Sequence, residues 1–197
     1  MFRKISLVAA SAALTFGAIA GSAGVAHAAA PPINATGTAN CTAVGKIKAS
    51  PALTIPATSG LTTVTTKVTI SGCTGTSPVL SGKGTFVSTA PTNNCTSLGA
   101  LHPFASTGTI KWKGTVKVNP STVHFSDQSS TLVDPLVSNA PGSGTSTVSG
   151  SFSGQHASAH YLLDQHQADL GTACTGKGIK KLSFSGASTF KITLVGP

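Results

Sequence analysis

Apolar and polar positions alternate through most of the chain after residue 40, the period-two pattern of half-buried β-strands. Cys41 to Ala49 and Leu61 to Ser71 both follow this pattern, and prolines at 51 and 56 are expected to keep the connection between them out of the sheet. The most regular stretch is Ile110 to Val118. Its apolar face predicts that the only tryptophan anchors the core, and this face carries Ile110, Trp112, Val116 and Val118.

Other stretches carry a weaker form of the pattern. Val79 to Ser88 alternates but is interrupted by two glycines. The segment from Ile179 to Leu194 is either one long strand or a hairpin that turns at residues 186–188. Residues 29–40 show no periodicity, which predicts a flexible N-terminal arm.

The stretch from Thr145 to Leu170 contains the clearest hairpin signal, because Gly154-Gln155 suits a two-residue type II′ turn. That register places one set of residues on a buried face: Val148, Gly150, Phe152, Ala157, Ala159 and Tyr161. It leaves His156 and His160 on the other face. Asp164 is expected to cap a short helical turn from Gln165 to Leu170.

Eight or nine strands without a long helix predict an all-β fold. The expected architecture is an antiparallel β-sandwich, with a closed β-barrel as the alternative. A single β-domain over residues 41–197 fits the length. The composition agrees, since only 9% of residues are charged and polarity comes from Ser, Thr, Gly and Asn.

The first 28 residues read as a secretory signal peptide. Arg3 and Lys4 precede an apolar run, and Ala26-His27-Ala28 matches an A-x-A cleavage pattern. After cleavage no apolar run reaches the ~20 residues that a membrane-spanning helix needs. The expected location is extracellular, either secreted or loosely associated with the cell wall.

Four cysteines in an exported chain predict two structural disulfides. When the strand ending near Ser71 folds back on the one that begins at Cys41, Cys73 comes close to Cys41 if Gly72 supplies a bend. This favours a bridge from Cys41 to Cys73. By elimination, the second bridge joins Cys95 and Cys174.

The predicted mature chain is basic. Without Arg3 and Lys4, the 13 basic residues fall to 11, all of them lysines. With four aspartates, the net charge is +7. Lysines recur on the polar faces of two predicted strands, and these candidates for anion binding are Lys46, Lys48, Lys111, Lys113 and Lys117. They either protect strand edges and confer solubility, or attract an anionic cell-wall polymer or membrane surface. Nucleic acid is not an expected partner, since no arginine remains after cleavage and aromatic residues are few.

A metal site is the sharpest hypothesis for His156, His160 and His166. On a helix the first two would share one face, but on a strand four residues separate them by about 13 Å, too far for one ion. The strand interpretation therefore predicts neither a metal nor a cofactor. Hydrolytic motifs are also incomplete, because Gly150–Gly154 lacks a central serine and the S-x-x-K match at Ser188–Lys191 has no companion motif.

Several structural motifs are spread over most of the mature chain: Ser50-Pro51-Ala52-Leu53, Ser71-Gly72-Cys73-Thr74-Gly75, Gly108-Thr109-Ile110-Lys111-Trp112 and Gly150-Ser151-Phe152-Ser153-Gly154. On these motifs the chain resembles a loose group of uncharacterised secreted β-rich proteins of Gram-positive bacteria. The resemblance implies export and a β fold, and assigns no catalytic residue. The expected function is a non-enzymatic structural or binding role, with an anionic cell-wall polymer or another surface protein as partner. The alternative is a metal-dependent or hydrolytic enzyme centred on residues 156–169.

Overall fold

Eleven β-strands and one short helix make up the described part of the chain. The structure is a computed structural model and describes residues 30–57, 60–90, 94–95, 105–126, 129–131, 137–140, 146–185 and 187–193. The predicted signal peptide lies outside these residues. The strands are β1 (Ala39–Leu53), β2 (Thr62–Thr74), β3 (Val79–Ala90), β4 (Ser106–Gly114), β5 (Ser121–Phe125), β6 (Ser129–Thr131), β7 (Val137–Ala140), β8 (Ser146–Gly150), β9 (His156–Leu162), β10 (Ile179–Phe184) and β11 (Thr189–Thr193), and the helix is α1 (Gln167–Thr175).

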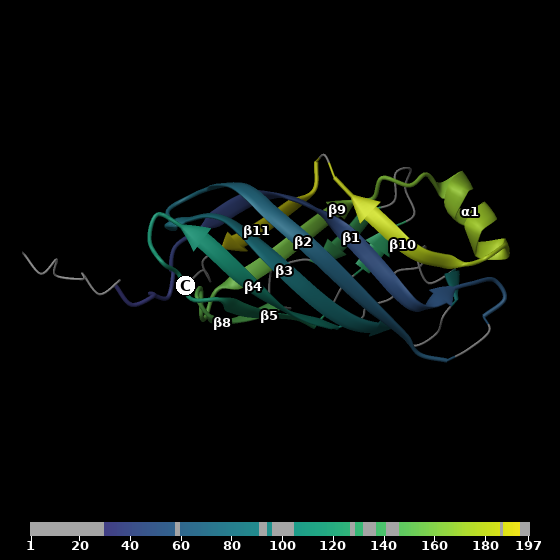
Figure 1. Cartoon of the computed structure of the whole chain (residues 1–197), viewed down its shortest axis with the longest axis horizontal. Coiled ribbons are helices and arrows are strands. Elements are labelled where there is room, and N and C mark those ends of the chain that lie inside the picture. Colours follow the sequence, from purple (N-terminus) through teal and green to yellow (C-terminus); the bar gives the residue numbers. More distant parts are fainter. Residues whose placement is uncertain are drawn as a thin grey trace, which may run out of the picture.

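All eleven strands belong to one antiparallel sheet, in the order β6-β7-β9-β11-β1-β2-β3-β4-β5-β8, with β10 also paired to β1. Figure 1 shows the sheet curled into a half-barrel, with β1 to β4 in front and β9 and β11 behind them. The predicted antiparallel β-structure is confirmed, but a single curled sheet replaces the predicted sandwich. The reason is that β1 is hydrogen-bonded along both edges, so the ladder continues from one layer into the other. The described strand path is open, because β6 and β8 end it.

The concave side of the sheet holds the core. Trp112 is 7% exposed and packs edge-on against Phe152, with 5.4 Å between the ring centroids. Its indole N–H donates to the Ser121 hydroxyl at 2.8 Å, and that hydroxyl donates to the Ser151 carbonyl oxygen at 2.6 Å. The prediction that Trp112 anchors the core is confirmed. Val116, expected on the same face, is 47% exposed because β4 ends at Gly114, before that position.

The predicted hairpin at Gly154-Gln155 is wrong in its pairing. β8 pairs with β5, whereas β9 pairs with β11 and β7, and residues 151–154 form the turn between β8 and β9. Phe152 lies in this turn with a φ of 65°, a left-handed conformation that delivers its fully buried ring to Trp112. Of the six residues predicted to be buried, five are buried and Gly150 is exposed.

The segment after β9 also differs from its prediction. α1 runs through Gly171 and ends before Gly176, and His166 rather than Asp164 occupies the N-cap position. Asp164 instead accepts a hydrogen bond from the Ser185 hydroxyl. The observed helix is thus longer than the predicted turn and starts later in the chain, because the carboxylate of Asp164 is hydrogen-bonded to the loop that follows β10.

The last two strands lie end to end along one edge of β1. β10 pairs with Gly45–Lys48 and Leu53, and β11 pairs with Ala39–Thr42. Between them the Ala43 N–H donates to the Ser188 carbonyl oxygen at 2.8 Å, so the pairing is nearly continuous. Of the two alternatives for this segment, the long strand is closer to the structure, interrupted rather than folded into a hairpin.

Two expectations near the N-terminus are corrected. The described part of the predicted flexible arm is held in place, since Ala35 is buried, its N–H donates to the Ser151 hydroxyl at 3.0 Å and its carbonyl oxygen accepts from the Phe152 N–H at 2.6 Å. Pro51 lies inside β1 rather than outside the sheet. It is tolerated there because the β1–β10 register shifts between Lys48 and Leu53, so its missing N–H falls at an irregularity of the ladder.

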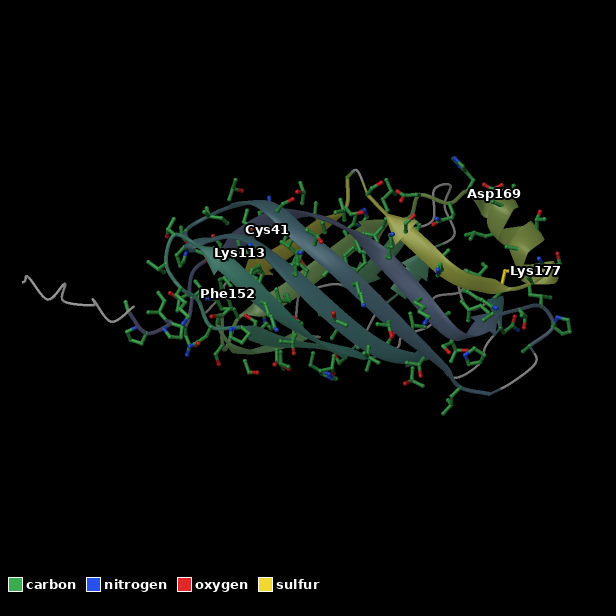
Figure 2. All side chains as sticks on the ribbon, viewed as in Figure 1. Cys41, Lys113, Phe152, Asp169 and Lys177 are labelled. Atoms are coloured by element: carbon green, nitrogen blue, oxygen red, sulfur yellow. A yellow bond between two sulfur atoms is a disulfide. The ribbon has the colours of Figure 1, made fainter. Side chains whose placement is uncertain are left out.

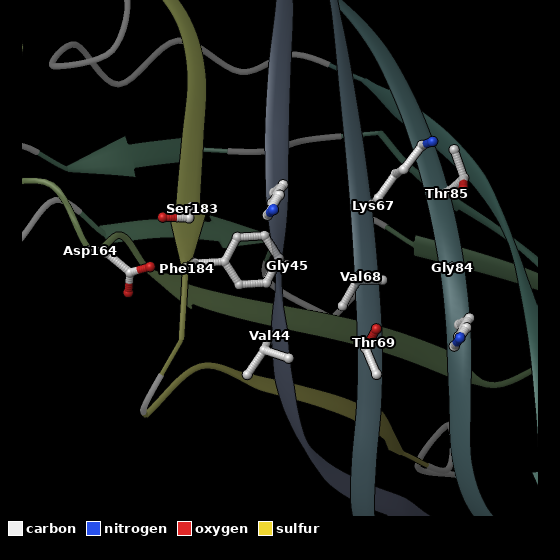
Figure 3. A pocket seen from close by; sticks show the side chains of 12 residues that line it. Val44, Gly45, Lys67, Val68, Thr69, Gly84, Thr85, Asp164, Ser183 and Phe184 are labelled. Carbon is white, nitrogen blue, oxygen red and sulfur yellow. The ribbon is translucent and has the colours of Figure 1, made fainter.

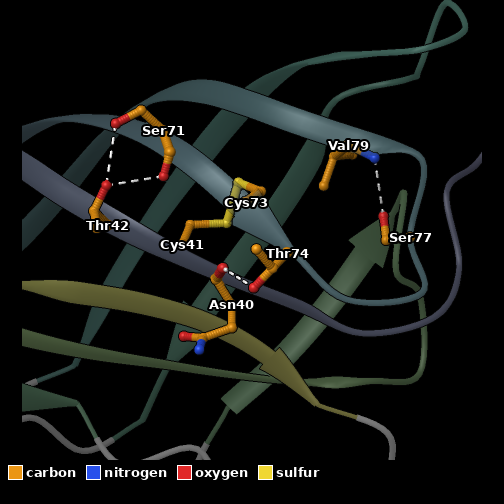
Figure 4. Close-up of a disulfide and its surroundings, with 8 residues drawn as sticks. All are labelled: Asn40, Cys41, Thr42, Ser71, Cys73, Thr74, Ser77 and Val79. Carbon is orange, nitrogen blue, oxygen red and sulfur yellow. Dashed lines mark hydrogen bonds between the residues drawn. A yellow bond between two sulfur atoms is a disulfide. The ribbon is translucent and has the colours of Figure 1, made fainter.

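Both predicted disulfides are present. Cys41 is bonded to Cys73 and Cys95 to Cys174. The register between β1 and β2 shifts between Asn40 and Thr42, and Gly72 has a φ of 59° at this bulge, which brings Cys73 opposite Cys41 (Figure 4). The bend predicted at Gly72 is therefore what aligns the two cysteines.

Candidate anion-binding face

Lysines and threonines predominate on the outer face of β1 to β4, where Val44, Leu80 and Val87 are also exposed. Residues of alternate parity point away from the core in each strand, and on this face Lys46, Lys67, Lys83 and Lys111 are all exposed. These four strands contain no aspartate or glutamate. The face therefore has a high density of positive charge with no carboxylate in its own strands.

Three pairs of lysines face each other directly across neighbouring strands: Lys48 with Lys181, Lys46 with Lys67, and Lys83 with Lys111. Side chains at facing positions lie about 5 Å apart at their Cβ atoms, and like charges placed there are destabilising. Threonines separate the second pair from the third, since Lys67 faces Thr85 and Thr69 faces Lys83. The facing pairs weaken the sheet electrostatically, so their presence needs an explanation other than stability.

The pairs are aligned along a diagonal of the sheet. Each pair is displaced by two residues from the preceding one as the strands are followed from β10 to β4. We call the following set the lysine stripe: Lys181, Lys48, Lys46, Lys67, Lys83, Lys111 and Lys113. With strands about 4.8 Å apart and a rise of about 3.3 Å per residue, the stripe is roughly 28 Å long.

The stripe follows the long axis of the molecule. In Figure 1 the strands slope across the view, with β10 toward the end that carries α1 and the tip of β4 toward the opposite end. Lys113, at one end of the stripe, is labelled in Figure 2 near Cys41 and Phe152, far from Asp169 in α1. The diagonal of the sheet is thus the lengthwise direction of the half-barrel.

Two shallow hollows lie along the stripe. The first has a volume of about 600 Å³, and its lining includes Lys46, Lys67, Lys83 and Thr85. The second, about 380 Å³, is lined by Lys83, Lys111 and Lys113 among others. Lys83 and Thr69 line both hollows, so they adjoin. In Figure 3 the Lys67 side chain extends from β2 toward Thr85 on β3.

One carboxylate borders the first hollow. Asp164 lines it from the β10 side, together with Ser183 (Figure 3). Hydrogen bonds from the hydroxyls of Ser185 and Ser183 lower the pKa of the Asp164 carboxyl below its ordinary value. Asp164 is therefore a fixed negative charge near one end of the stripe.

The structure brings together four of the five lysines predicted as anion-binding candidates. Lys46 and Lys48 on β1 and Lys111 and Lys113 on β4 all lie on the outer face, whereas Lys117 lies beyond the end of β4. Three members of the stripe were not among those candidates: Lys67, Lys83 and Lys181. The outward parity of Lys67 in its alternating strand was a usable signal, while Lys83 was hidden between two glycines that weakened its strand.

The histidines of the predicted polar edge do not form a comparable site. His156 and His160 lie on strand β9, paired with Thr193 and Thr189, and His166 lies at the start of α1. The strand geometry places the first two about 13 Å apart. Within the described ranges no group of three or more His, Cys, Asp or Glu residues could hold a metal ion.

The S-x-x-K match does not assemble a nucleophile and base. The Ser188 side chain is fully buried, and its hydroxyl oxygen accepts from the Leu162 N–H at 2.9 Å. Lys191 is exposed, at the opposite parity of the same strand segment. The two side chains therefore lie on opposite faces of the sheet.

Comparisons with known proteins give no further guidance. No protein-family model, curated protein or solved structure matches this chain. Among the described residues no helix has the length and apolar character required to cross a membrane.

Proposed function

We propose that this protein is an exported, non-enzymatic binding protein that holds an anionic polymer of the cell wall against the lysine stripe. The observation that carries the proposal is the set of three directly facing lysine pairs on one sheet face. An anion lying between two such ammonium groups would relieve their mutual repulsion and gain attraction to both. The excess of positive charge over the single bordering carboxylate, Asp164, is thus a reason for the bound state to be favoured.

Edge protection, the alternative role of lysines, does not account for Lys46, Lys48, Lys67 and Lys83. Lysine protects a sheet where a strand lacks a partner. These four lysines lie where β1, β2 and β3 pair on both sides. By contrast, the pairing of β4 with β5 ends at Ile110, before Lys111, and among the described strands β10 pairs with β1 alone. Solubility alone would be served equally by lysines placed away from one another, or by lysines alternating with carboxylates.

The residue types favour a polymer recognised by charge. All the cations of the stripe are lysines, compact point charges that do not impose the planar geometry of arginine. The outward positions of β1 to β4 carry no exposed aromatic ring on which a base could stack. This supports a wall polyanion as the ligand in preference to nucleic acid.

Export is supported by the two disulfides, because such bonds persist in oxidising compartments. The signal-peptide pattern of residues 1–28 and the resemblance to secreted β-rich proteins agree with this part of the proposal. Association with the wall would then be electrostatic and reversible by salt.

Two variants with equal charge test the proposal. The first replaces Lys46, Lys67, Lys83 and Lys111 with glutamine, and the second replaces four lysines outside the stripe with glutamine: Lys117, Lys177, Lys180 and Lys191. Binding to purified, anionic cell-wall material is measured by sedimentation at low salt. We expect the stripe variant to lose most of its binding and the control to stay close to wild type. Equal losses in both variants would mean that net charge alone drives association, and would refute the site.

A further inference from the structure

We infer that the ligand is a linear phosphate-bearing chain that lies lengthwise along the whole stripe. This inference rests on the proposed function and adds to it the shape, the direction and the chemical class of the ligand. Its geometric basis is that the seven lysines form one narrow band, not a scattered field. With roughly 28 Å for seven ammonium groups, the mean interval is about 4 to 5 Å, a spacing suited to a chain with closely repeated charges.

The curvature of the sheet favours the lengthwise direction. A half-barrel curves around its circumference and is nearly straight along its length, which is the direction of the stripe (Figures 1 and 2). A chain lying along the stripe meets successive lysines without bending. A chain lying around the circumference would cross the stripe and leave it after one or two lysine pairs.

The hollows argue for a chain rather than a flat surface. Lysines line both depressions, which adjoin at Lys83, so a ligand must enter between the side chains to contact the whole set. A thin polymer can do so, whereas a membrane surface rests on the tips of the outermost side chains. The exposed apolar side chains of these strands are the aliphatic residues Val44, Leu80 and Val87, and no outward aromatic residue accompanies them to insert among lipids.

The donors along the stripe suit phosphate. Each ammonium offers three N–H donors to separate oxygens, and lysine is a common phosphate ligand that acts as a point charge. The hydroxyls of Thr69 and Thr85 border the same hollow as Lys67 and are exposed. A phosphate group with several acceptor oxygens can accept from an ammonium and a neighbouring hydroxyl together.

A chain-length series tests this inference with inorganic polyphosphate as the probe. Affinity for the wild-type protein is measured across salt concentrations for triphosphate and for chains longer than the stripe. A chain that contacts all seven lysines should give a slope of log affinity against log salt of about −5, at roughly 0.7 per neutralised phosphate, and triphosphate should give about −2. A slope that is the same for both lengths would overturn the lengthwise arrangement.

End variants locate the chain. Replacing Lys48, Lys181 and Lys113 with glutamine should reduce the slope for long polyphosphate by about 2, and leave the slope for triphosphate bound at the central lysines nearly unchanged. Replacing Lys117, Lys177 and Lys191 is the control with equal charge and should affect neither probe. Far-ultraviolet circular dichroism and thermal unfolding show that each variant is folded.

The outcomes separate the two levels of the proposal. If the central lysines are needed but length and end variants have no effect, the charged site stands and the lengthwise chain is wrong. If phosphatidylglycerol vesicles bind more tightly than long polyphosphate at equal phosphate concentration, a membrane surface is the ligand and the inference fails. If the central variant binds long polyphosphate as tightly as wild type does, both the inference and the proposed function fail.

Discussion

Gly45 lies where β1 passes close to the Phe184 ring. A Cβ atom at this position would be 2.5 Å from Phe184 Cζ and would also meet the carbonyl oxygen of Lys67. Gly45→Ala should therefore lower the free energy of unfolding by about 1 to 3 kcal/mol, because neither a fully buried ring nor a backbone oxygen can move aside freely.

Chemical denaturation measures the effect of this substitution. Gly60→Ala is the matched control, since a Cβ there would have no atom within 4 Å. If Gly45→Ala is as stable as Gly60→Ala, the close approach of Phe184 to β1 is incorrect.

A second prediction at the residue scale is that Asp164 makes the free energy of unfolding depend on pH. Its pKa is lowered in the folded protein, mainly by the Ser185 hydroxyl. A carboxyl with a lower pKa in the folded than in the unfolded state stabilises the fold above its unfolded pKa of about 4, and this contribution is lost as the pH falls through the folded pKa.

The stability difference between wild type and Asp164→Asn should therefore be larger at pH 6 than at pH 2. Ser185→Ala removes the main donor and should reproduce part of the effect. Denaturation curves for the three proteins at both pH values give the comparison. A difference that does not vary with pH would show that this hydrogen bond does not hold the carboxylate.

At the scale of the elements, a substitution that removes the repulsion between facing lysines should stabilise the fold and weaken polyanion binding. Lys67→Glu places opposite charges across β1 and β2, facing Lys46. Opposite charges at facing positions stabilise by about 0.2 to 1 kcal/mol, so the variant should unfold at higher denaturant concentration than wild type while binding the polyanion less tightly. The gain should shrink at high salt, which screens exposed charges.

Lys177→Glu is the matched control for this substitution. It makes the same change of charge after α1, at a position outside the strand pairs. If the two variants gain equal stability at low salt, the effect comes from net charge and the facing arrangement has no special role.

The elements also show where sequence reasoning succeeds and where it stops. Alternation within a strand is local, so it located β1, β2 and the second half of β4 and gave the correct outward parity for Lys46 and Lys111. The pairing of strands is not local. The lysine stripe depends on the register between β1, β2, β3 and β4, which no single strand reveals.

The turn between β8 and β9 shows a second limit. Glycine followed by glutamine is a sound local signal for a tight hairpin. The burial of Phe152 against Trp112 outweighs it, because a large aromatic contact stabilises more than a favourable turn. That contact is distant in sequence, so the local signal was misleading there.

At the scale of the whole molecule, both disulfides act near the ends of one strand. Cys41, of the first bridge, lies near the start of β1. Just beyond the end of β1, both cysteines of the second bridge are hydrogen-bonded to the chain. The Cys95 N–H donates to the Thr54 carbonyl oxygen at 3.1 Å, and the Ile55 N–H donates to the Cys174 carbonyl oxygen at 3.0 Å. The bridges close intervals of 32 and 79 residues. In the chain-entropy model each stabilises by about 4 kcal/mol.

This placement has a mechanical consequence. If the proposed wall polymer is the ligand, the bound protein is under tension whenever the wall expands or the surrounding fluid flows past it. Under such tension the intervals 41–73 and 95–174 cannot lengthen, because each is closed covalently. Three strands of the stripe, β1, β2 and β4, have residues within these closed intervals. Force on the chain would therefore extend the segments outside the bridges first, and these include β3 with Lys83 and β10 with Lys181. The stripe residues on β1, β2 and β4 lie within covalently closed intervals and would be extended last.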